Sequence, residues 1–146
     1  MNDATCNNKH HNNSITNNIQ NQLTSTINTI SIDNILDEVA KQSVKTIKID
    51  VEGYEYECLL GMLNTIKKSN PIIFFECISS KNNTEIELFL KKEKYTIFIV
   101  DDLKGSTKQT NKVSPILDLD NNIIHDQINR VALPKSKIDL IEKIFT

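Results

Sequence analysis

Residues 46–77 read TIKIDVEGYEYECLLGMLNTIKKSNPIIFFEC, and this stretch decides the fold class. The stretch begins in one β-branched, apolar segment, VKTIKIDV at 44–51, and ends in another, PIIFFECI at 71–78. These two segments predict two strands. The second segment is apolar on both faces, as expected of a central strand in a parallel sheet. Gly53 ends the first strand, and apolar residues at helical spacing then predict a helix that ends near Ser69–Asn70. Strand, helix and strand in this order predict a parallel crossover unit.

The pattern continues on both sides of this stretch. The further expected elements are a short strand at 26–30, a helix capped by Ser31 and running to about Gln42, a helix opened by the capping box Thr84–Glu87, a strand at 95–100, a polar loop containing Gly105, a strand at 128–133, and a final helix capped by Ser136. Strands that alternate with helices predict an α/β domain with a mainly parallel sheet.

Composition limits the size and class of the protein. The chain has 146 residues, enough for one domain. Residues 1–23 are rich in Asn and poor in large apolar side chains, so we expect a disordered tail before a folded domain at 24–146. A net charge of −2 without a basic stripe argues against a nucleic-acid partner. No apolar run approaches the roughly 20 residues of a membrane span, which argues against a membrane partner.

Cysteine usage and the N-terminus bear on the compartment. The three cysteines have neither disulfide nor metal spacing, and Cys58 and Cys77 sit in apolar segments, where we expect them to be buried. The N-terminus lacks the apolar core of a secretory signal. These features favour a reducing, cytoplasmic location.

Acidic residues follow the predicted strands. Ligands of open α/β sheets bind beyond the carboxyl ends of the strands. Asp50 and Glu52 end the first strong strand, Glu76 lies near the end of the second, and Asp101 and Asp102 end the third. We therefore expect acids from successive strands to meet at one rim. Each acid has a structural alternative, because Asp and Glu after a strand often cap the next helix, and Asp101 and Asp102 suit a turn.

Lys48 interrupts an otherwise apolar strand. Alternation along the strand places Lys48 and Asp50 on one face and Ile47, Ile49 and Val51 on the other. A lysine in such a strand needs a partner or a route to water. We therefore expect Lys48 to pair with Asp50 or Glu76.

The 46–77 stretch resembles the FkbM family of S-adenosylmethionine-dependent methyltransferases. That family shows a strand reading roughly IKIDVEG, a helix that begins with Glu and contains a Leu-x-Gly step, and a Pro-led strand that ends in Glu. The matching residues here are Ile47–Gly53, Glu55, Leu59–Gly61 and Pro71–Glu76, with SIDNILDE at 31–38 and KKEKYTIFIVDD at 91–102 as further support. The resemblance covers about residues 26–134.

The resemblance implies a fold, an activity and a site. The fold is part of a Rossmann-like class I methyltransferase sheet whose last strand is antiparallel. The activity is methyl transfer from S-adenosylmethionine to an oxygen, usually a sugar or natural-product hydroxyl. Asp50, Glu52 and Glu76 would be the catalytic acids, with Lys48 and Tyr54 beside them as acceptor-binding residues. A carboxylate pair could also hold Mg²⁺, although spacing alone supports this weakly, and we assign no metal ligands.

One half of the family pattern is missing from the sequence. The family's first half has a Gly-rich loop and a later acid that hold the cofactor, whereas Gly53, Gly61 and Gly105 form no G-x-G here. The chain therefore resembles the second half of the domain, and we identify no cofactor-binding residues. Without the preceding strand, one edge of residues 44–51 is open, which favours self-association or a partner chain there.

Three functions fit these observations. The chain is an O-methyltransferase that needs its missing half for activity, a non-catalytic binding or regulatory remnant of such an enzyme, or an unrelated α/β enzyme that uses metal-bound carboxylates.

Overall fold

The computed structural model describes residues 28–39, 43–78 and 81–145. The chain divides into two units, Met1–Ile30 and Ser31–Thr146. The predicted disordered tail at 1–23 lies outside the described residues. The strand predicted at 26–30 is absent from its described part, since residues 28–30 carry no regular structure.

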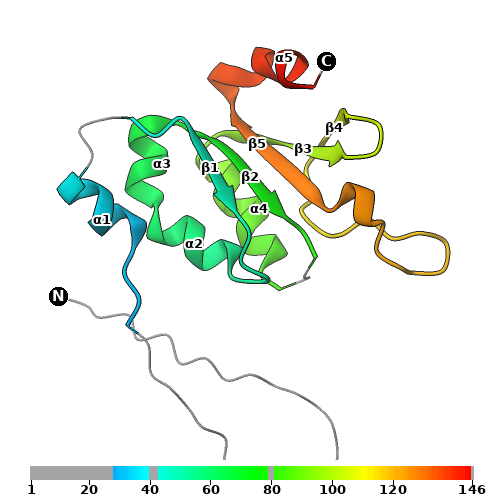
Figure 1. The fold of residues 1–146 in the computed structure, drawn as a ribbon, viewed down its shortest axis with the longest axis horizontal. Helices are drawn as coiled ribbons and strands as arrows, with labels where there is room; N and C mark the ends of the chain where they lie inside the picture. Colours follow the sequence, from blue (N-terminus) through cyan, green and yellow to red (C-terminus); the bar gives the residue numbers. More distant parts are fainter. Residues whose placement is uncertain (1–27, 40–42, 79–80, 146) are drawn as a thin grey trace, which may run out of the picture. The chain divides into compact units, whose positions relative to one another are not determined.

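The second unit is built on one sheet (Figure 1). Its described strands are β1 (Thr46–Ile49), β2 (Ile72–Glu76), β3 (Tyr95–Asp101), β4 (Ser106–Thr110) and β5 (Asn129–Pro134), in the order β1-β2-β5-β3-β4. β1 and β2 are parallel, with Thr46 opposite Ile72 and Ile49 opposite Phe75. β5 lies antiparallel between β2 and β3, and β4 is antiparallel to β3.

The α/β class and the antiparallel last strand are confirmed, but the sheet is mixed rather than mainly parallel. β5 separates β2 from β3, so these two strands share a direction without pairing directly. β4 lies where a polar loop was expected. β4 reads STKQT and lies at the edge of the sheet, where it buries too little to need an apolar alternation.

Helices cover both faces of the sheet. They are α1 (Ile32–Val39), α2 (Glu55–Gly61), α3 (Leu63–Ser69), α4 (Asn83–Lys92) and α5 (Ile141–Ile144), with 3-10 helices η1 (His125–Gln127) and η2 (Lys135–Leu140). Figure 1 shows α2, α3 and α4 along one side of the sheet and α5 on the chain that leaves β5. No helix within the described ranges is long and apolar enough to cross a membrane.

Two apolar clusters follow from the alternation along β2 and β5. Ile73, Phe75 and Ala132 point toward the cluster that includes Leu59, Ile66 and Leu90 of the helices. Val131 and Leu133 point to the opposite cluster, which Phe74 joins and which η2 and α5 cover with Ile138 and Ile141. β2 and β5 are therefore covered on both faces, as the uninterrupted apolar run at 71–78 predicted for β2.

The single helix predicted after Gly53 is divided at Met62 into α2 and α3. The break leaves the first N–H groups of α3 without partners in their own helix. Asp33 of α1 supplies acceptors for two of these N–H groups. Its carboxylate accepts the N–H of Asn64 at 2.8 Å, the N–H of Thr65 at 2.8 Å and the Thr65 hydroxyl at 2.7 Å. Asp33 is buried, so this cap joins α1 to α3.

The predicted helix caps had mixed outcomes. The predicted Ser31 cap is confirmed, because the Ser31 Oγ accepts the N–H of Asn34 at 3.2 Å. The capping box at Thr84–Glu87 is wrong. Asn82 precedes α4 with φ 59°, and the Glu87 carboxylate instead accepts the N–H of Val113 at 2.9 Å. Ser136 is also not a cap, since η2 starts at Lys135 directly after Pro134 and carries no side-chain cap.

Arg130 of β5 is a buried cation that holds the segment after β4 against the sheet. It is 1% exposed, and its guanidinium donates to the carbonyl oxygens of Gln127 at 2.6 Å and Ser114 at 2.9 Å. Burial lowers the pKa of Arg130. Arg130 thus ties Ser114 and Gln127, the two ends of the segment 114–127, to β5.

Replacement of Asp33 by Ala should destabilise the protein by about 2 kcal/mol, because two N–H groups of α3 and a buried hydroxyl lose their acceptor. Urea unfolding followed by circular dichroism measures the change. Asp139→Ala is the matched control, since Asp139 is exposed and its loss should change the unfolding free energy by less than about 0.5 kcal/mol. Equal effects from the two variants would contradict the role assigned to the Asp33 cap.

Candidate functional site

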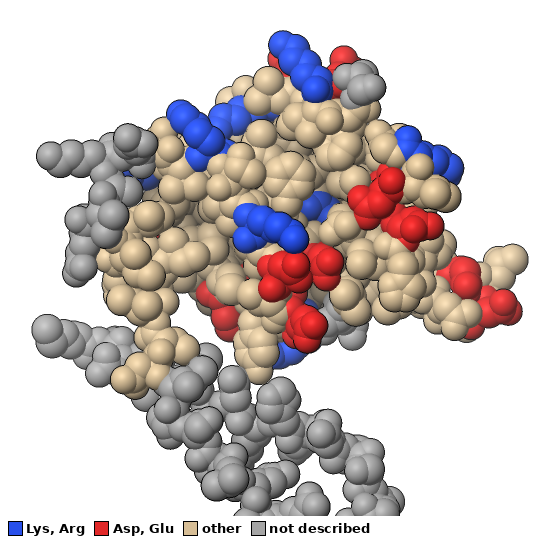
Figure 2. Space-filling model, viewed as in Figure 1, with Lys and Arg blue, Asp and Glu red and all other residues tan. Residues whose placement is uncertain are grey.

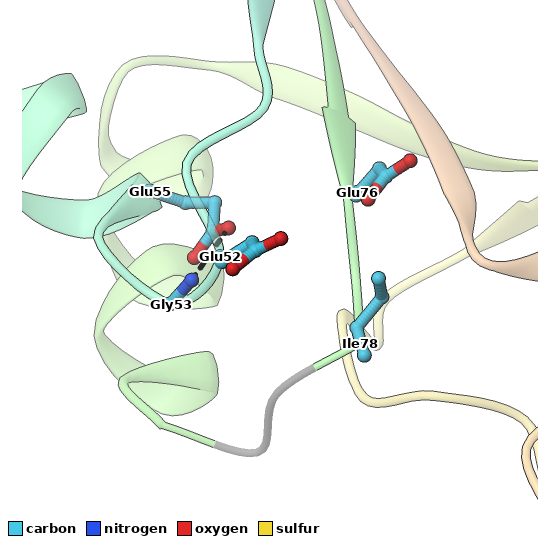
Figure 3. A pocket seen from close by; sticks show the side chains of 5 residues that line it. All are labelled: Glu52, Gly53, Glu55, Glu76 and Ile78. Carbon is cyan, nitrogen blue, oxygen red and sulfur yellow. Dashed lines mark hydrogen bonds between the residues drawn. The ribbon is translucent and has the colours of Figure 1, made fainter.

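A cavity of about 210 Å³ lies beyond the carboxyl ends of β1 and β2. Its lining comes from the turn after β1, the start of α2 and the end of β2: Glu52, Gly53, Glu55, Glu76 and Ile78 (Figure 3). This is the position at which open α/β sheets bind ligands. Parallel pairing of the two strands brings their ends to the same level.

The turn after β1 has an unusual backbone. Glu52 has φ 48° and Gly53 has φ 97°, so both residues lie in the left-handed half of the conformational map. Gly tolerates this region, whereas a residue with a Cβ is disfavoured there by about 1–2 kcal/mol. Such strain persists where the surroundings impose it, and it is concentrated at functional sites.

Glu55 stabilises this turn with a hydrogen bond to its backbone. The residue is 6% exposed, and its Oε1 accepts the N–H of Gly53 at 3.0 Å. Glu55 is also the first residue of α2, where the helix dipole favours a carboxylate. In Figure 3 the Glu55 side chain turns back to Gly53, whereas Glu52 extends toward the strand that bears Glu76.

Glu76 supplies the other side of the cavity. It is the last residue of β2, is only partly exposed, and lies opposite Asn129 of β5. Ile78, two residues later, is 43% exposed and adds an apolar surface. The cavity therefore offers carboxylate oxygens beside a hydrocarbon wall, an arrangement that suits a small ligand with hydroxyl or cationic groups.

Two of the three predicted catalytic acids, Glu52 and Glu76, line the cavity, and Asp50 does not. Lys48 Nζ and Asp50 Oδ2 form an ion pair of 3.1 Å, which confirms the predicted pairing. The Lys48 side chain is 72% exposed, so it has a route to water as well as a partner. β1 is an edge strand, and this face of it has ready access to water.

Tyr54, predicted to bind the acceptor, also lies beside the cavity rather than in its lining. It is partly buried, and Lys81 Nζ lies 4.3 Å from the centre of its ring. Tyr56 is a packing group and meets Phe89 edge-on at 6.5 Å between ring centres. The assignment of Lys48 and Tyr54 to acceptor binding stays a prediction.

The acids at the end of the third strand serve the fold. Asp101 accepts the N–H of Lys104 at 2.9 Å and the side-chain amide of Gln127 at 3.1 Å. The Lys104 N–H is the main reason that the pKa of Asp101 is lowered. Asp102 accepts the side-chain amide of Asn129 at 2.7 Å. The predicted turn role is confirmed for Asp101, and the acids of three strands do not converge.

Sequence reasoning did not select Glu55 or Ile78 as site residues. Glu55 has a recognisable signal, an acid at the first position of a helix that follows a strand and a Gly. The signal was interpreted only as part of a family pattern. Nothing in the sequence marks Ile78 as a site residue, since an apolar residue at a strand end suits the core equally well.

Acidic side chains gather around this end of the sheet. Figure 2 shows several of them below the point at which β1 and β2 end, whereas most Lys and Arg side chains on this face lie higher. The described residues contain no group of three or more His, Cys, Asp or Glu side chains that could hold a metal ion. The suggested Mg²⁺ therefore has no support from the site.

The described thiols do not provide a nucleophile. Cys77 is buried, and burial raises its pKa to about 12. Burial also raises the pKa of Cys58, which packs against the core. The predicted burial is confirmed for Cys77, whereas Cys58 is only partly buried, and both thiols remain protonated near neutral pH.

Comparison with known proteins gives one match. A family model described as the methyltransferase FkbM domain matches residues 1–97, which include β1, the strained turn, α2, α3 and β2. No curated protein and no solved structure matches the chain. The match begins earlier and ends earlier than the 26–134 span over which the resemblance was noted.

The strain at Glu52 should be measurable as stability. Glu52→Gly should be more stable than Glu52→Ala by about 1 kcal/mol, because Gly adopts φ 48° without a Cβ clash and both variants lose the carboxylate. Chemical denaturation of the two variants gives the difference. If Glu52→Ala were at least as stable as Glu52→Gly, the left-handed conformation would not be imposed in solution.

Proposed function

Because this chain belongs to the family of the methyltransferase FkbM domain, whose chemistry is methyl transfer from S-adenosylmethionine, we propose that its acidic cavity binds the methyl acceptor. We further propose that the acceptor group is a hydroxyl of a sugar or small natural product. The observation that carries this proposal is the meeting of Glu52 and Glu76 in one cavity at adjacent strand ends.

The two carboxylates suit the chemistry of a hydroxyl acceptor. O-methylation replaces the hydroxyl proton, and a carboxylate within hydrogen-bond reach can orient the hydroxyl and receive that proton. Glu52 comes from the turn after β1 and Glu76 from the end of β2, so they can contact the acceptor from two sides. The Glu55 carboxylate is less accessible to an acceptor, because it is buried and accepts the N–H of Gly53. We propose that Glu55 positions Glu52.

Size and surface favour a small acceptor moiety. A cavity of about 210 Å³ with Ile78 on one wall can hold a single sugar ring or a ring of similar size. Lys48, Asp50 and Tyr54 lie outside this space. We propose them as contacts only for acceptors that extend beyond the cavity.

The described residues do not fit the whole cofactor. Binding pockets for cofactors and drug-sized ligands are typically about 300–1,000 Å³, larger than this cavity. The cavity is lined by acids, and its one glycine, Gly53, follows an acid rather than forming a Gly-rich loop. We therefore assign acceptor-side residues and derive no contact to the cofactor.

The direction of the strands supports a Rossmann-like assignment for the sheet. β1 and β2 are parallel, and β3 shares their direction because both β2 and β3 are antiparallel to β5. We propose that β1, β2, β3 and β5 form the second half of a class I methyltransferase sheet, with β4 as an added edge strand.

A non-catalytic binding or regulatory remnant is the second candidate. The observation that favours it is the same mismatch with the cofactor, since a chain that keeps the acidic cavity without a cofactor site could still bind the acceptor. The third candidate, an unrelated enzyme with metal-bound carboxylates, is set aside because the family is shown and no metal group is found among the described residues.

Methyl transfer from radiolabelled S-adenosylmethionine to a panel of sugars and hydroxylated aromatics tests the catalytic proposal. Glu52→Gln and Glu76→Gln should each lower kcat/KM by about 10²–10⁴-fold, because the amide cannot accept the proton. The matched control is Glu85→Gln, an exposed residue of α4, which should stay within about twofold. Activity unchanged in both cavity variants would rule out their proposed role.

Calorimetry separates the two candidates. We expect the 146-residue chain to bind S-adenosylmethionine more weakly than about 100 µM, because the described cavity is too small for it. Micromolar binding, about −8 kcal/mol, would contradict that expectation and place a complete cofactor site in this chain. Absent cofactor binding together with retained acceptor binding would favour the remnant.

A further inference from the structure

Glu76 of the proposed site has a polar neighbour directly across the sheet. β2 and β5 pair antiparallel, and Glu76 lies opposite Asn129. The N–H of Cys77 donates to the carbonyl of Ile128 at 2.9 Å. The adjacent pair in the ladder, Glu76 with Asn129, is therefore of the non-hydrogen-bonded kind, in which the Cα atoms are about 4.5 Å apart and the side chains lie closest. The side-chain amide of Asn129 is thus within reach of the Glu76 carboxylate.

The Asn129 amide is nevertheless directed to the other side of β5. Its Nδ2 donates to Asp102 Oδ2 at 2.7 Å. Among the described residues, no hydrogen bond or ion pair of the Glu76 side chain is found. Figure 3 shows this side chain extending from β2 toward the neighbouring β5. The direction of the Asn129 amide, rather than its distance, therefore leaves Glu76 without a donor.

The bond between Asn129 and Asp102 is not needed to hold the strands together. β3 and β5 already pair at five positions, and the N–H of Asp102 donates to the carbonyl of Asp126 at 2.8 Å. The bond also satisfies no fully buried group, because Asn129 is partly exposed and Asp102 is exposed. What it fixes is the direction of the Asn129 amide, and a charge-assisted bond of this kind is roughly twice as strong as one between neutral groups.

We propose that Asp102 is a positioning residue for the methyl transfer, which holds the Asn129 amide away from Glu76 and so leaves the Glu76 carboxylate free for the acceptor hydroxyl. This inference rests on the function proposed for Glu76. A carboxylate that accepts an amide N–H has one oxygen occupied and its charged form stabilised, which makes it a weaker proton acceptor. Asp102 lies outside the cavity and acts through Asn129 alone.

Methyl transfer by the full chain tests the effect on the reaction. Asp102→Ala should lower kcat/KM by about tenfold, because the released Asn129 amide turns to Glu76 and occupies its carboxylate. Removing the amide as well, in Asp102→Ala with Asn129→Ala, should restore kcat/KM to within about threefold of the wild type. Asp102→Asn keeps an acceptor oxygen for the Asn129 amide and should also stay within about threefold.

Asp126→Ala is the matched control. Asp126 is exposed, lies beside Asp102 through their backbone hydrogen bond, and carries the same charge, so its loss should change kcat/KM by less than about twofold. A merely structural role for Asp102 would leave the variant that lacks both Asp102 and Asn129 at least as impaired as Asp102→Ala. That result, or an Asp102→Asn variant as impaired as Asp102→Ala, would overturn the proposal.

Nuclear magnetic resonance of the asparagine side-chain amides gives a readout that needs no activity. The Asn129 signal is assigned by its absence from Asn129→Ala. In the wild type it should move on Asp102→Ala and barely respond to Glu76→Gln, whereas in the Asp102→Ala background it should respond clearly to Glu76→Gln.

The two measurements separate this inference from the function on which it rests. Unchanged activity in Glu76→Gln, together with the expected amide shifts, would contradict the function proposed for Glu76 while confirming the direction of the Asn129 amide. An Asn129 signal that ignores Glu76→Gln in the Asp102→Ala background would overturn the positioning role of Asp102, whatever the activity of the chain.

Discussion

Parallel pairing of β1 with β2 is the constraint on which the candidate site depends. The register aligns Thr46 with Ile72 and Ile49 with Phe75, so the two strands end at nearly the same level. The chain must then turn sharply after β1 to enter α2, while Glu76 stands one residue beyond the last aligned pair. Two acids that are 24 residues apart in sequence therefore share one cavity because the strands are parallel and in this register.

The site is supported by residues to which no reactive role is assigned. Glu55 fixes the turn through Gly53, and α2 must end early because α3 starts a new helix at Leu63. That new start is stabilised by Asp33 from α1. The strained conformation of Glu52 is thus supported by neighbours that are themselves held by hydrogen bonds. Such support lets a protein retain a disfavoured backbone at a functional position.

β1 precedes the site along the chain and contributes none of its lining residues. β1 leads directly into the Glu52–Gly53 turn, and its outward residues Lys48 and Asp50 belong to the edge rather than to the cavity. Asp50 was grouped with Glu52 as a catalytic acid because both follow the apolar part of the strand. The turn after β1 separates them, because Glu52 at φ 48° leaves the alternation that would otherwise place it on the same face as Asp50.

The sequence by itself determined the local elements and the family. The apolar run at 71–78, the breaks at Gly53 and Asn70, and the acids after each strand were all visible as patterns, because burial and backbone conformation impose them residue by residue. Tertiary structure alone decided which acids meet. β5 enters between β2 and β3 and so keeps Asp101 away from Glu76, and polar β4 leaves no periodic trace at the sheet edge. The division of the long helix at Met62 likewise depends on Asp33, whose carboxylate comes from a different helix, and no local pattern records a partner 31 residues away.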